Sequence, residues 1–291
     1  MIERLCIIGV GLIGGSLARA LRDAGAVQEV VGAGRNVDNL QTAVDLGVID
    51  RYSTDLADAV AGADMVVVCV PLGSMEGVFT AIKDRLDPQA VLTDVGSAKG
   101  GVIEAAQRAF GQVPDFFVPG HPIAGTEQSG VAASFAGLYR DRRVILTPLD
   151  ATQANATDRV RDMWQAAGAQ VVCMEAVHHD VVLAATSHLP HLLAFSLVDT
   201  LSRLDEQNEV FDYAAGGFRD FTRIASSDPV MWRDICLANG DAILLMIEQY
   251  VEDLQVASDA IRAQDGQQLQ DLFTRAKAAR DSYAADQQGK D

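Results

Sequence analysis

Residues 4–16 read Arg-Leu-Cys-Ile-Ile-Gly-Val-Gly-Leu-Ile-Gly-Gly-Ser, and this stretch decides the fold. Residues 4–10 are a mainly apolar run that ends in glycines, which is typical of a buried strand followed by a tight turn. Residues 12–24 are rich in small and apolar side chains and predict a helix. The stretch therefore predicts a strand, a glycine turn and a helix in immediate succession.

The glycines of this turn are spaced as Gly-x-Gly-x-x-Gly, a pattern that binds a dinucleotide when it joins a strand to a helix. Gly9 permits the tight turn, Gly11 lets the backbone approach a pyrophosphate, and Gly14 allows the helix to pack closely on the strand. The N-terminus of the helix then faces the phosphates. We therefore expect a dinucleotide to bind at Gly9, Gly11, Leu12, Ile13 and Gly14.

Short apolar strands alternate with helices in the rest of the first part of the chain. Because fully apolar strands must be covered on both faces, this alternation indicates a doubly wound, mostly parallel sheet. From residue 175 onward the sequence shows long helical patterns and no convincing strand. We therefore predict an α/β domain over residues 1–174 and an all-helical domain over residues 175–291. The further strands are expected at residues 29–32, 65–70, 90–94, 116–119, 143–147 and 170–174, and the long helices at residues 177–201, 230–262 and 267–284.

The composition excludes several kinds of partner. The chain of 291 residues carries 40 acidic and 23 basic side chains, which gives a net charge of −17. A field of this sign repels polyanions, so we expect no nucleic acid partner and no membrane partner. No apolar run approaches the roughly 20 residues of a membrane span.

The cysteines indicate a reducing environment. Cys6, Cys69, Cys173 and Cys236 lie far apart among apolar neighbours and form no Cys-x-x-Cys pair. We therefore expect buried free thiols, with neither a metal site nor a redox site. The first residues run directly into a strand without a secretion signal, so the sequence predicts a cytoplasmic protein.

The choice of cofactor is read about 20 residues after the glycine motif, where an acidic side chain would bind the ribose 2′-hydroxyl of NAD. Residues 32–36 read Gly-Ala-Gly-Arg-Asn, without a carboxylate. Arg35 is either a partner for the 2′-phosphate of NADP or an ordinary loop arginine, so NAD and NADP both stay open, with a lean toward NADP. Val70 and Pro71 end a strand at the carboxyl edge of the sheet, where ligands bind; they either lie near the nicotinamide ribose, as we expect, or simply terminate the strand.

A serine and a histidine are the candidates for chemistry. Ser97 follows the strand at residues 90–94 and either caps the next helix or hydrogen-bonds a substrate. His121 lies on a loop with Pro122 and Gly125, and its ordinary pKa allows it to accept a proton near neutral pH. We expect His121 to be the general base of a dehydrogenase that oxidises an alcohol.

The helical part contains four of the five histidines. His188 and His191 are three residues apart on one helix face, but no third ligand is placed by the sequence, so no metal site is predicted. His178 and His179 begin the same helix, and we expect them to be a solvated or capping pair.

Two arginines stand close together in this acidic part of the chain. Arg219 and Arg223 predict a receptor for a substrate carboxylate, because guanidinium groups bind carboxylates through two hydrogen bonds. The alternative is a pair of salt bridges to Asp220 and Asp228 within the chain.

Five motifs together resemble the prephenate/arogenate dehydrogenase family of tyrosine biosynthesis. The resemblance implies a Rossmann domain followed by a helical dimerisation domain, and hence a homodimer. It covers most of the chain, from the first strand to Trp232. The motifs are Val-Gly-Leu-Ile-Gly-Gly-Ser at 10–16, Asp-Val-Gly-Ser-Ala-Lys-Gly at 94–100, His-Pro-Ile-Ala-Gly-Thr-Glu-Gln-Ser-Gly at 121–130, Ser-His-Leu-Pro-His at 187–191 and Gly-Phe-Arg-Asp-Phe-Thr-Arg-Ile-Ala at 217–225.

The resemblance implies oxidative decarboxylation of prephenate to 4-hydroxyphenylpyruvate, or of arogenate to tyrosine. By this resemblance His121 takes the proton of the ring hydroxyl, Ser97 positions that hydroxyl, and Arg223 holds a substrate carboxylate. The sequence departs from NAD-using relatives at Gly34 and Arg35, where they tend to have an acidic residue. The remaining positions that the resemblance assigns to the substrate pocket are Thr126, Glu127, Ser187, His191, Asp220 and Trp232.

Two other functions compete with this one. A β-hydroxyacid dehydrogenase shares the domain plan but needs a lysine on a helix of the second part, which holds only Lys277 and Lys290, both near its end. A non-catalytic dinucleotide-binding protein would keep the glycine turn but has no use for His121 and the arginines together. The sequence does not decide between prephenate and arogenate.

Overall fold

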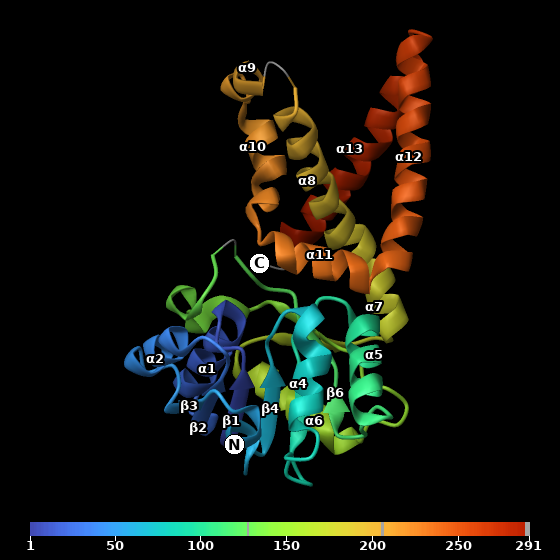
Figure 1. Cartoon of the computed structure of the whole chain (residues 1–291). Helices are drawn as coiled ribbons and strands as arrows, with labels where there is room; N and C mark the ends of the chain where they lie inside the picture. The colour runs from blue at the N-terminus through green and yellow to red at the C-terminus, as the bar shows by residue number, and fades with distance from the viewer. Residues whose placement is uncertain (127, 205–206, 289–291) are drawn as a thin grey trace. The chain divides into compact units, whose positions relative to one another are not determined.

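The computed structural model describes residues 1–126, 128–204 and 207–288, and it contains a six-stranded parallel sheet in the order β3-β2-β1-β4-β5-β6 (Figure 1). This order reverses direction between β1 and β4, which is the arrangement of a Rossmann domain. The predicted α/β fold is confirmed, with β3 as an extra edge strand that the sequence did not predict. The strands are β1 Ile2–Ile8, β2 Val27–Ala33, β3 Arg51–Ser53, β4 Met65–Val68, β5 Val91–Asp94 and β6 Phe117–Val118. The helices between them are α1 Leu12–Asp23, α2 Val37–Asp45, α3 Leu56–Val60, η1 Leu72–Ser74, α4 Met75–Ile82 and α5 Lys99–Phe110.

A second sheet of three strands follows, in the order β7-β8-β9. β7 Gly120–Pro122 pairs antiparallel with β8 Arg143–Leu146, which pairs parallel with β9 Gln170–Cys173. His121 is thus the middle residue of a short strand rather than part of a loop. The expectation of four buried thiols holds for Cys6 alone, since Cys69 and Cys236 are half-buried and Cys173, on the edge strand β9, is exposed. The short helices η2 Val131–Ala133 and η3 Ala136–Tyr139 precede β8, and α6 Ala154–Ala166 joins β8 to β9.

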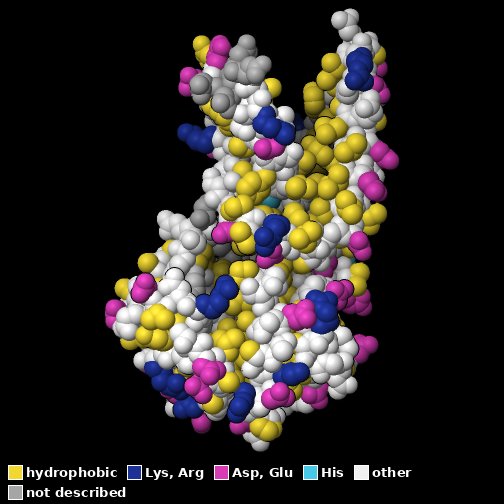
Figure 2. Space-filling view, in the orientation of Figure 1, with side chains coloured by type: hydrophobic (Ala, Val, Ile, Leu, Met, Phe, Trp, Pro, Cys, Tyr) yellow, Lys and Arg dark blue, Asp and Glu magenta, His cyan; other side chains and the backbone are white. Residues whose placement is uncertain are grey.

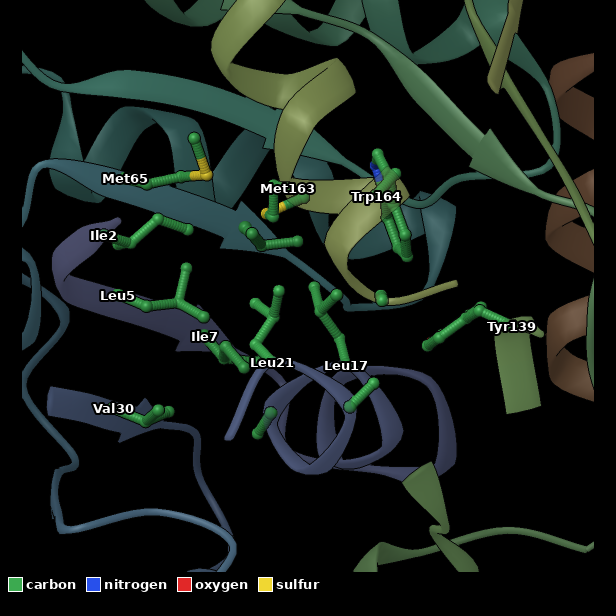
Figure 3. Packing of buried hydrophobic residues seen from close by; sticks show 14 of the residues in the cluster. Ile2, Leu5, Ile7, Leu17, Leu21, Val30, Met65, Tyr139, Met163 and Trp164 are labelled. Carbon is green, nitrogen blue, oxygen red and sulfur yellow. The ribbon is translucent and has the colours of Figure 1, made fainter. Parts of the chain in front are cut away.

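Both faces of the six-stranded sheet are packed against helices. In β1, Leu5 and Ile7 belong to one buried cluster, while Cys6 and Ile8 belong to another. This alternation follows from the period of two along a strand. Figure 3 shows the first cluster, in which Leu17 and Leu21 of α1 and Trp164 of α6 pack against the sheet. The second cluster packs α3, α4 and α5 on the opposite face, with Phe79 and Phe117 in edge contact at 5.4 Å.

The helical part begins with one long helix that changes its winding. α7 Ala176–Leu183 passes through a π-helical turn, Ala184–His188, into α8 Leu189–Ser202. Pro190 explains the wide turn, because its ring would clash with the carbonyl of Thr186 in a regular α-helix. The helix predicted over residues 230–262 is broken at Asn239, which ends α11. The remaining helices are α9 Gln207–Asp212, α10 Gly216–Thr222, η5 Arg223–Ser226, α11 Pro229–Ala238, α12 Gly240–Arg262 and α13 Gly266–Gln288.

The described residues form two compact units, Met1–Ile243 and Leu244–Asp291. The division at residues 174 and 175 stays a prediction, since the first helices of the helical part belong to the first unit. The second unit exposes many large apolar side chains on its two helices, among them Leu245 at 62% and Phe273 at 63%. Figure 2 shows hydrophobic side chains gathered over these helices.

One helix is long and apolar enough to cross a membrane by length and composition. It is Ala176–Ser202, with a mean hydropathy of 1.6 over 18 residues, of which 22% are buried. The expectation that no segment approaches this limit is therefore wrong. The helix nevertheless places His179 and Asp180 inside the first unit, so its first turns serve as part of a packed protein interior.

Candidate active site

The glycine turn has the backbone that a bound pyrophosphate requires. Gly9 has a φ of +97°, and a Cβ there would lie 2.4 Å from the carbonyl oxygen of Cys69. At Gly14 a Cβ would lie 2.6 Å from the carbonyl oxygen of Gly9, so α1 can sit against β1 only without a side chain. Above Gly11 the space is open, and α1 begins there without an acidic residue in its first turn. These features fit an anion at the helix N-terminus.

A cavity of about 1120 Å³ opens beside this turn at the carboxyl ends of the strands. Among the predicted cofactor residues, the cavity is lined by Gly9, Gly11, Arg35, Val70 and Pro71. Leu12, Ile13 and Gly14 lie outside its wall, on the packed side of α1, and their contact with a cofactor stays a prediction. None of the described residues that line the cavity is acidic.

A buried ion pair holds the turn that carries Ser97. The Nζ atom of Lys99 donates to the carboxylate of Asp94 at 2.6 Å and to the carbonyl of Gly120 at 2.5 Å, and both charged side chains are fully buried. The same carboxylate accepts hydrogen bonds from the main-chain nitrogens of Gly96 at 2.6 Å and Gly120 at 3.1 Å. These contacts fix the end of β5, and with it Ser97, against the residue that precedes His121.

The structure excludes one of the two interpretations of Ser97, that of a helix cap. The N-cap residue of α5 is Ala98, so Ser97 is not the cap. The first N–H groups of the helix, those of Lys99 and Gly100, instead donate to the carboxylate of Asp180, each at 2.8 Å. Ser97 is half-buried at the carboxyl edge of the sheet, and its hydrogen bond to a substrate stays a prediction.

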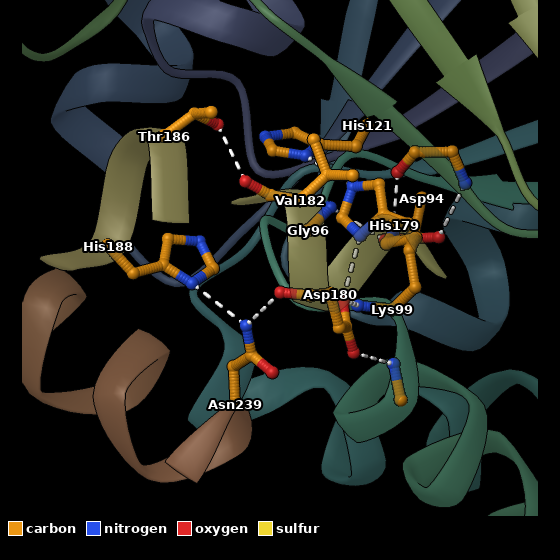
Figure 4. Close-up of polar contacts among 12 residues, drawn as sticks. Asp94, Gly96, Lys99, His121, His179, Asp180, Val182, Thr186, His188 and Asn239 are labelled. Atoms are coloured by element: carbon orange, nitrogen blue, oxygen red, sulfur yellow. Dashed lines mark hydrogen bonds and ion pairs between the residues drawn. The ribbon is translucent and has the colours of Figure 1, made fainter. Parts of the chain in front are cut away.

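His121 is the first member of a buried chain of polar side chains (Figure 4). Its Nδ1 atom lies 2.9 Å from Nε2 of His179, and Nδ1 of His179 lies 2.7 Å from the carboxylate of Asp180. The expectation that His178 and His179 form a solvated pair is wrong for His179, which is fully buried, whereas His178 is exposed. A helix that packs on α5 turns consecutive residues in different directions, so only one of the two histidines enters the interior.

The surroundings of His121 and Asp180 determine which of the two carries a charge near pH 7. Burial lowers the pKa of His121 well below its usual value, and the nearby Lys99, His179 and His188 lower it further. The imidazole of His121 is therefore neutral near pH 7 and can accept a proton. Burial acts to raise the pKa of Asp180, but hydrogen bonds from His179 and from the α5 main chain outweigh burial and lower it, so Asp180 is ionised.

A second group of rings lies on the helical side. The ring of His191 stacks on Trp232 with centroids 3.7 Å apart, and His188 approaches the same indole edge-on at 6.2 Å. Nδ1 of His188 lies 3.0 Å from the side-chain nitrogen of Asn239, which also donates to the carbonyl of Asp180 at 2.9 Å. Within the described residues, Nε2 of His188 and Nε1 of Trp232 are buried without a hydrogen-bond partner. These nitrogens are candidate donors for a ligand.

Burial lowers the pKa of His188 to about 4, although Asp180 and the main chain of Ser97 act in the opposite direction. Burial also lowers the pKa of His191, whose Nδ1 lies 2.8 Å from the carbonyl of Ser187. Both rings are therefore neutral near pH 7. Among the described residues no group of His, Cys, Asp and Glu side chains is arranged to hold a metal ion.

The helix that carries Trp232 is attached to the wall of the dinucleotide cavity. Asp234 of α11 accepts a hydrogen bond from the main-chain nitrogen of Gly73 at 3.2 Å, and Gly73 lines the cavity. A side chain at Gly73 would meet the Asp234 carboxylate at 2.7 Å. The Asp234–Gly73 hydrogen bond thus links the rings of His188, His191 and Trp232 (the ring group) to the dinucleotide cavity within one compact unit.

The remaining predicted residues lie nearer the surface. Asp220 is exposed over 81% of its side chain, 4.0 Å from the equally exposed Arg219. Arg223, at the start of η5, and Thr126 are also exposed, and Ser187 is half-buried in the π-helical turn. Glu127 lies outside the described residues. The contacts of the described residues do not bring Asp220 or Thr126 to His121, and their roles stay predictions.

Sequence reasoning missed His179, Asp180 and Asn239 and gave no part to Asp94 and Lys99. The signal was available at residues 178–180, which read His-His-Asp at the start of a markedly apolar helix. Polar side chains that such a helix buries must find hydrogen-bond partners, because an unpaired buried polar group is costly.

The family model for the nucleotide-binding domain of prephenate dehydrogenase matches residues 17–173, and that for its dimerization domain matches residues 175–275. The chain is 38% identical over 283 residues to a cyclohexadienyl dehydrogenase from Zymomonas mobilis, covering 96% of this chain and 95% of the relative. It is 33% identical to a prephenate dehydrogenase from Bacillus subtilis, covering 99% of this chain and 78% of the relative.

Solved structures agree. The prephenate dehydrogenase of Aquifex aeolicus, in complex with hydroxyphenyl propionate and NAD+, superposes with a TM-score of 0.89 at 37% identity, covering 96% of this chain and 98% of that one. An arogenate dehydrogenase from Synechocystis superposes with a TM-score of 0.80 at 26% identity, covering 97% and 100%. The matches extend over both the Rossmann domain and the helices that carry the ring group. The chain is therefore an oxidoreductase that belongs to the prephenate dehydrogenase family.

Proposed function

We propose that the chain converts prephenate to 4-hydroxyphenylpyruvate and CO2 with NAD+ or NADP+ as the hydride acceptor, a step of tyrosine synthesis. The observation that carries this proposal is a buried, neutral histidine at the carboxyl edge of a sheet whose glycine turn fits a dinucleotide. A non-catalytic dinucleotide-binding protein has no use for such a base. A β-hydroxyacid dehydrogenase would need a lysine on a helix of the second part as proton donor, and the lysines there are Lys277 and Lys290, both near its end.

The proposed reaction needs one base and one acceptor of electrons. Nε2 of His121 makes no hydrogen bond within the described residues and takes the proton of the ring hydroxyl. A bound nicotinamide supplies the oxidant by accepting hydride from the carbon that bears this hydroxyl. The ring carboxylate then leaves as CO2, and its bonding electrons complete the aromatic ring. Transfer of the proton to a positioned side chain contributes about 10²–10⁴-fold to the rate of such a step.

Other residues of the family motifs hold the substrate in this proposal. The hydroxyl of Ser97 hydrogen-bonds the ring hydroxyl, and Arg223 binds a substrate carboxylate. His191 and Trp232 form a flat wall, because their rings are stacked, with Trp232 buried and His191 half-buried. The further pocket positions that we propose are Thr126, Glu127, Ser187 and Asp220.

We also propose that the chain accepts NADP+ and not only NAD+. Arg35 is exposed on the wall of the cavity, and no acidic side chain in the part of the chain that the structure describes lines this wall. A carboxylate at this place would repel the 2′-phosphate of NADP+, whereas a guanidinium group binds it.

We propose a cytoplasmic homodimer. The family model that matches residues 175–275 is named for dimerization, and the apolar helix Ala176–Ser202 is only 22% buried over its most apolar window. A second copy of the chain would cover this surface. The four free thiols suit the reducing conditions of a cytoplasm.

The proposed function is tested by a steady-state assay of prephenate and arogenate, each with NAD+ and NADP+. We expect turnover of prephenate that falls by about 10²–10⁴-fold in His121→Asn with little change in KM. Faster turnover of arogenate than of prephenate would replace the proposed substrate. Absence of turnover with all four pairs, in a protein that binds the dinucleotide, would leave the non-catalytic alternative.

A further inference from the structure

The buried chain from His121 to Asp180 specifies where each ring carries its proton. A carboxylate only accepts hydrogen bonds, so Asp180 requires the proton of His179 to lie on Nδ1. With one ring proton, placed on Nδ1, His179 presents Nε2 as an acceptor. The atom that faces it, Nδ1 of His121 at 2.9 Å, must carry a proton and donate it. The remaining nitrogen of His121, Nε2, is left with its lone pair.

The surroundings hold this arrangement in place. His179 has no exposed surface, so water cannot supply an alternative partner. The Asp180 carboxylate receives two N–H groups from the start of α5, and the carbonyl of Asp180 receives the side chain of Asn239. Each oxygen of the carboxylate therefore accepts a main-chain hydrogen bond, and these contacts determine how the carboxylate is oriented toward His179.

The charged and titratable groups around His179 are few. They are His121 on one side, Asp180 on the other, and the Lys99 ammonium group, which is paired with Asp94 at 2.6 Å. His188 is the remaining titratable neighbour, and it is neutral near pH 7. Because no second carboxylate among the described residues reaches His179, Asp180 determines which nitrogen of its ring carries the proton.

We propose that His179 and Asp180 are positioning residues that fix the tautomer of His121, so that its Nε2 lone pair faces the reacting hydroxyl. The inference rests on the proposed function, in which His121 is the base. The signal in the sequence is the dipeptide His179-Asp180, whose neighbour His178 is exposed and provides a matched control.

The substitution Asp180→Asn tests the proposal. An asparagine amide can donate to Nδ1 of His179, which moves the proton of that ring to Nε2. Nδ1 of His121 then becomes the acceptor, and its Nε2 carries the proton and cannot act as a base. We expect kcat to fall by about 10²–10⁴-fold, as for loss of a positioned base, with KM changed by less than about threefold. Asp180→Glu should recover part of kcat, and His178→Asn should leave it unchanged.

A second measurement does not depend on activity. The chain has five histidines, so ¹⁵N spectra of histidine-labelled protein can be assigned with single variants. We expect His121 protonated on Nδ1 in the wild type and on Nε2 in Asp180→Asn. A wild-type His121 protonated on Nε2, or an Asp180→Asn enzyme within threefold of normal kcat, would overturn the proposal. If the wild type turns over neither substrate, the proposed function fails, while the spectra still decide the tautomer.

Discussion

Replacing Lys99 by methionine should destabilise the protein more than any loss of packing would suggest. Methionine preserves most of the length of the side chain, but it removes the positive charge that lies 2.6 Å from the Asp94 carboxylate. Both side chains are fully buried, so water cannot take the place of the ammonium group. The carboxylate keeps only the two N–H groups of Gly96 and Gly120.

The magnitude follows from leaving one buried charge without its partner, which costs about 3–5 kcal/mol. For a domain of this size each kcal/mol lowers Tm by roughly 2–4 °C, so Lys99→Met should melt roughly 6–20 °C below the wild type. Adding Asp94→Asn removes the uncompensated charge, although the single amide oxygen can accept from only one of the N–H groups of Gly96 and Gly120, which donate to different carboxylate oxygens. The double variant should therefore recover part of the lost stability.

The assay is urea unfolding followed by tryptophan fluorescence, since Trp164 and Trp232 both lie in the first unit. Lys83→Met is the matched control, because Lys83 is exposed, and it should change the free energy of unfolding by less than about 0.5 kcal/mol. A Lys99→Met protein within 1 kcal/mol of wild type, or a double variant less stable than the single one, would refute the argument from the buried charge.

Three further outcomes follow from the site. Arg35→Ala should lower kcat/KM with NADP+ about tenfold, the cost of one exposed charge-assisted contact, and leave kcat/KM with NAD+ unchanged; equal losses with both cofactors would return Arg35 to an ordinary loop residue. His188 has a folded pKa of about 4 against 6.5 when unfolded, so the folded state binds fewer protons, and its contribution to stability is present above pH 6.5 and is lost as pH falls toward 4. Between pH 7 and pH 5 the stability lost through His188 amounts to about 2 kcal/mol. In His188→Gln the free energy of unfolding in urea should therefore fall by about 2 kcal/mol less over this range than in the wild type. An unchanged pH dependence would contradict the argument from burial. Arg223→Ala should raise KM for prephenate with a smaller effect on kcat, because the contact exists in ground and transition states alike, and an unchanged KM would remove Arg223 from the substrate site.

The first half of the fold was predictable because its signals are local. The apolar strand, the glycine turn and the small-residue helix lie within residues 4–24, and each signal depends on neighbours in sequence. The strand β7 was not predictable in this way, because His121 becomes part of a strand only by pairing with β8, more than 20 residues later. The break at Asn239 has the same cause, since its side chain is drawn to His188 and Asp180 from a distant helix.

The candidate site was predictable in part for similar reasons. His121 and Ser97 could be selected from the sequence because each follows a predicted strand. The carboxyl ends of these strands meet at the edge of the sheet where ligands bind. His179 did not stand out, because adjacent histidines at the start of a helix are as compatible with water as with burial. Only the packing of α7 on α5 decides that His179 enters the interior and His178 does not.

The π-helical turn Ala184–His188 has a consequence for how the two histidine groups are related. The N–H of Leu189 bonds to the carbonyl of Ala184 five residues earlier, so this turn contains one residue more than an α-helical turn would. Each residue of an α-helix advances the chain by about 100°. In a regular α-helix without this residue, and without the ring of Pro190, all of α8 would be rotated against α7 by about that angle. His179 would keep its place beside Asp180, while His191 would turn away from Trp232. The extra residue thus sets the rotation of α8, which carries His191, relative to α7, which carries His179 and Asp180.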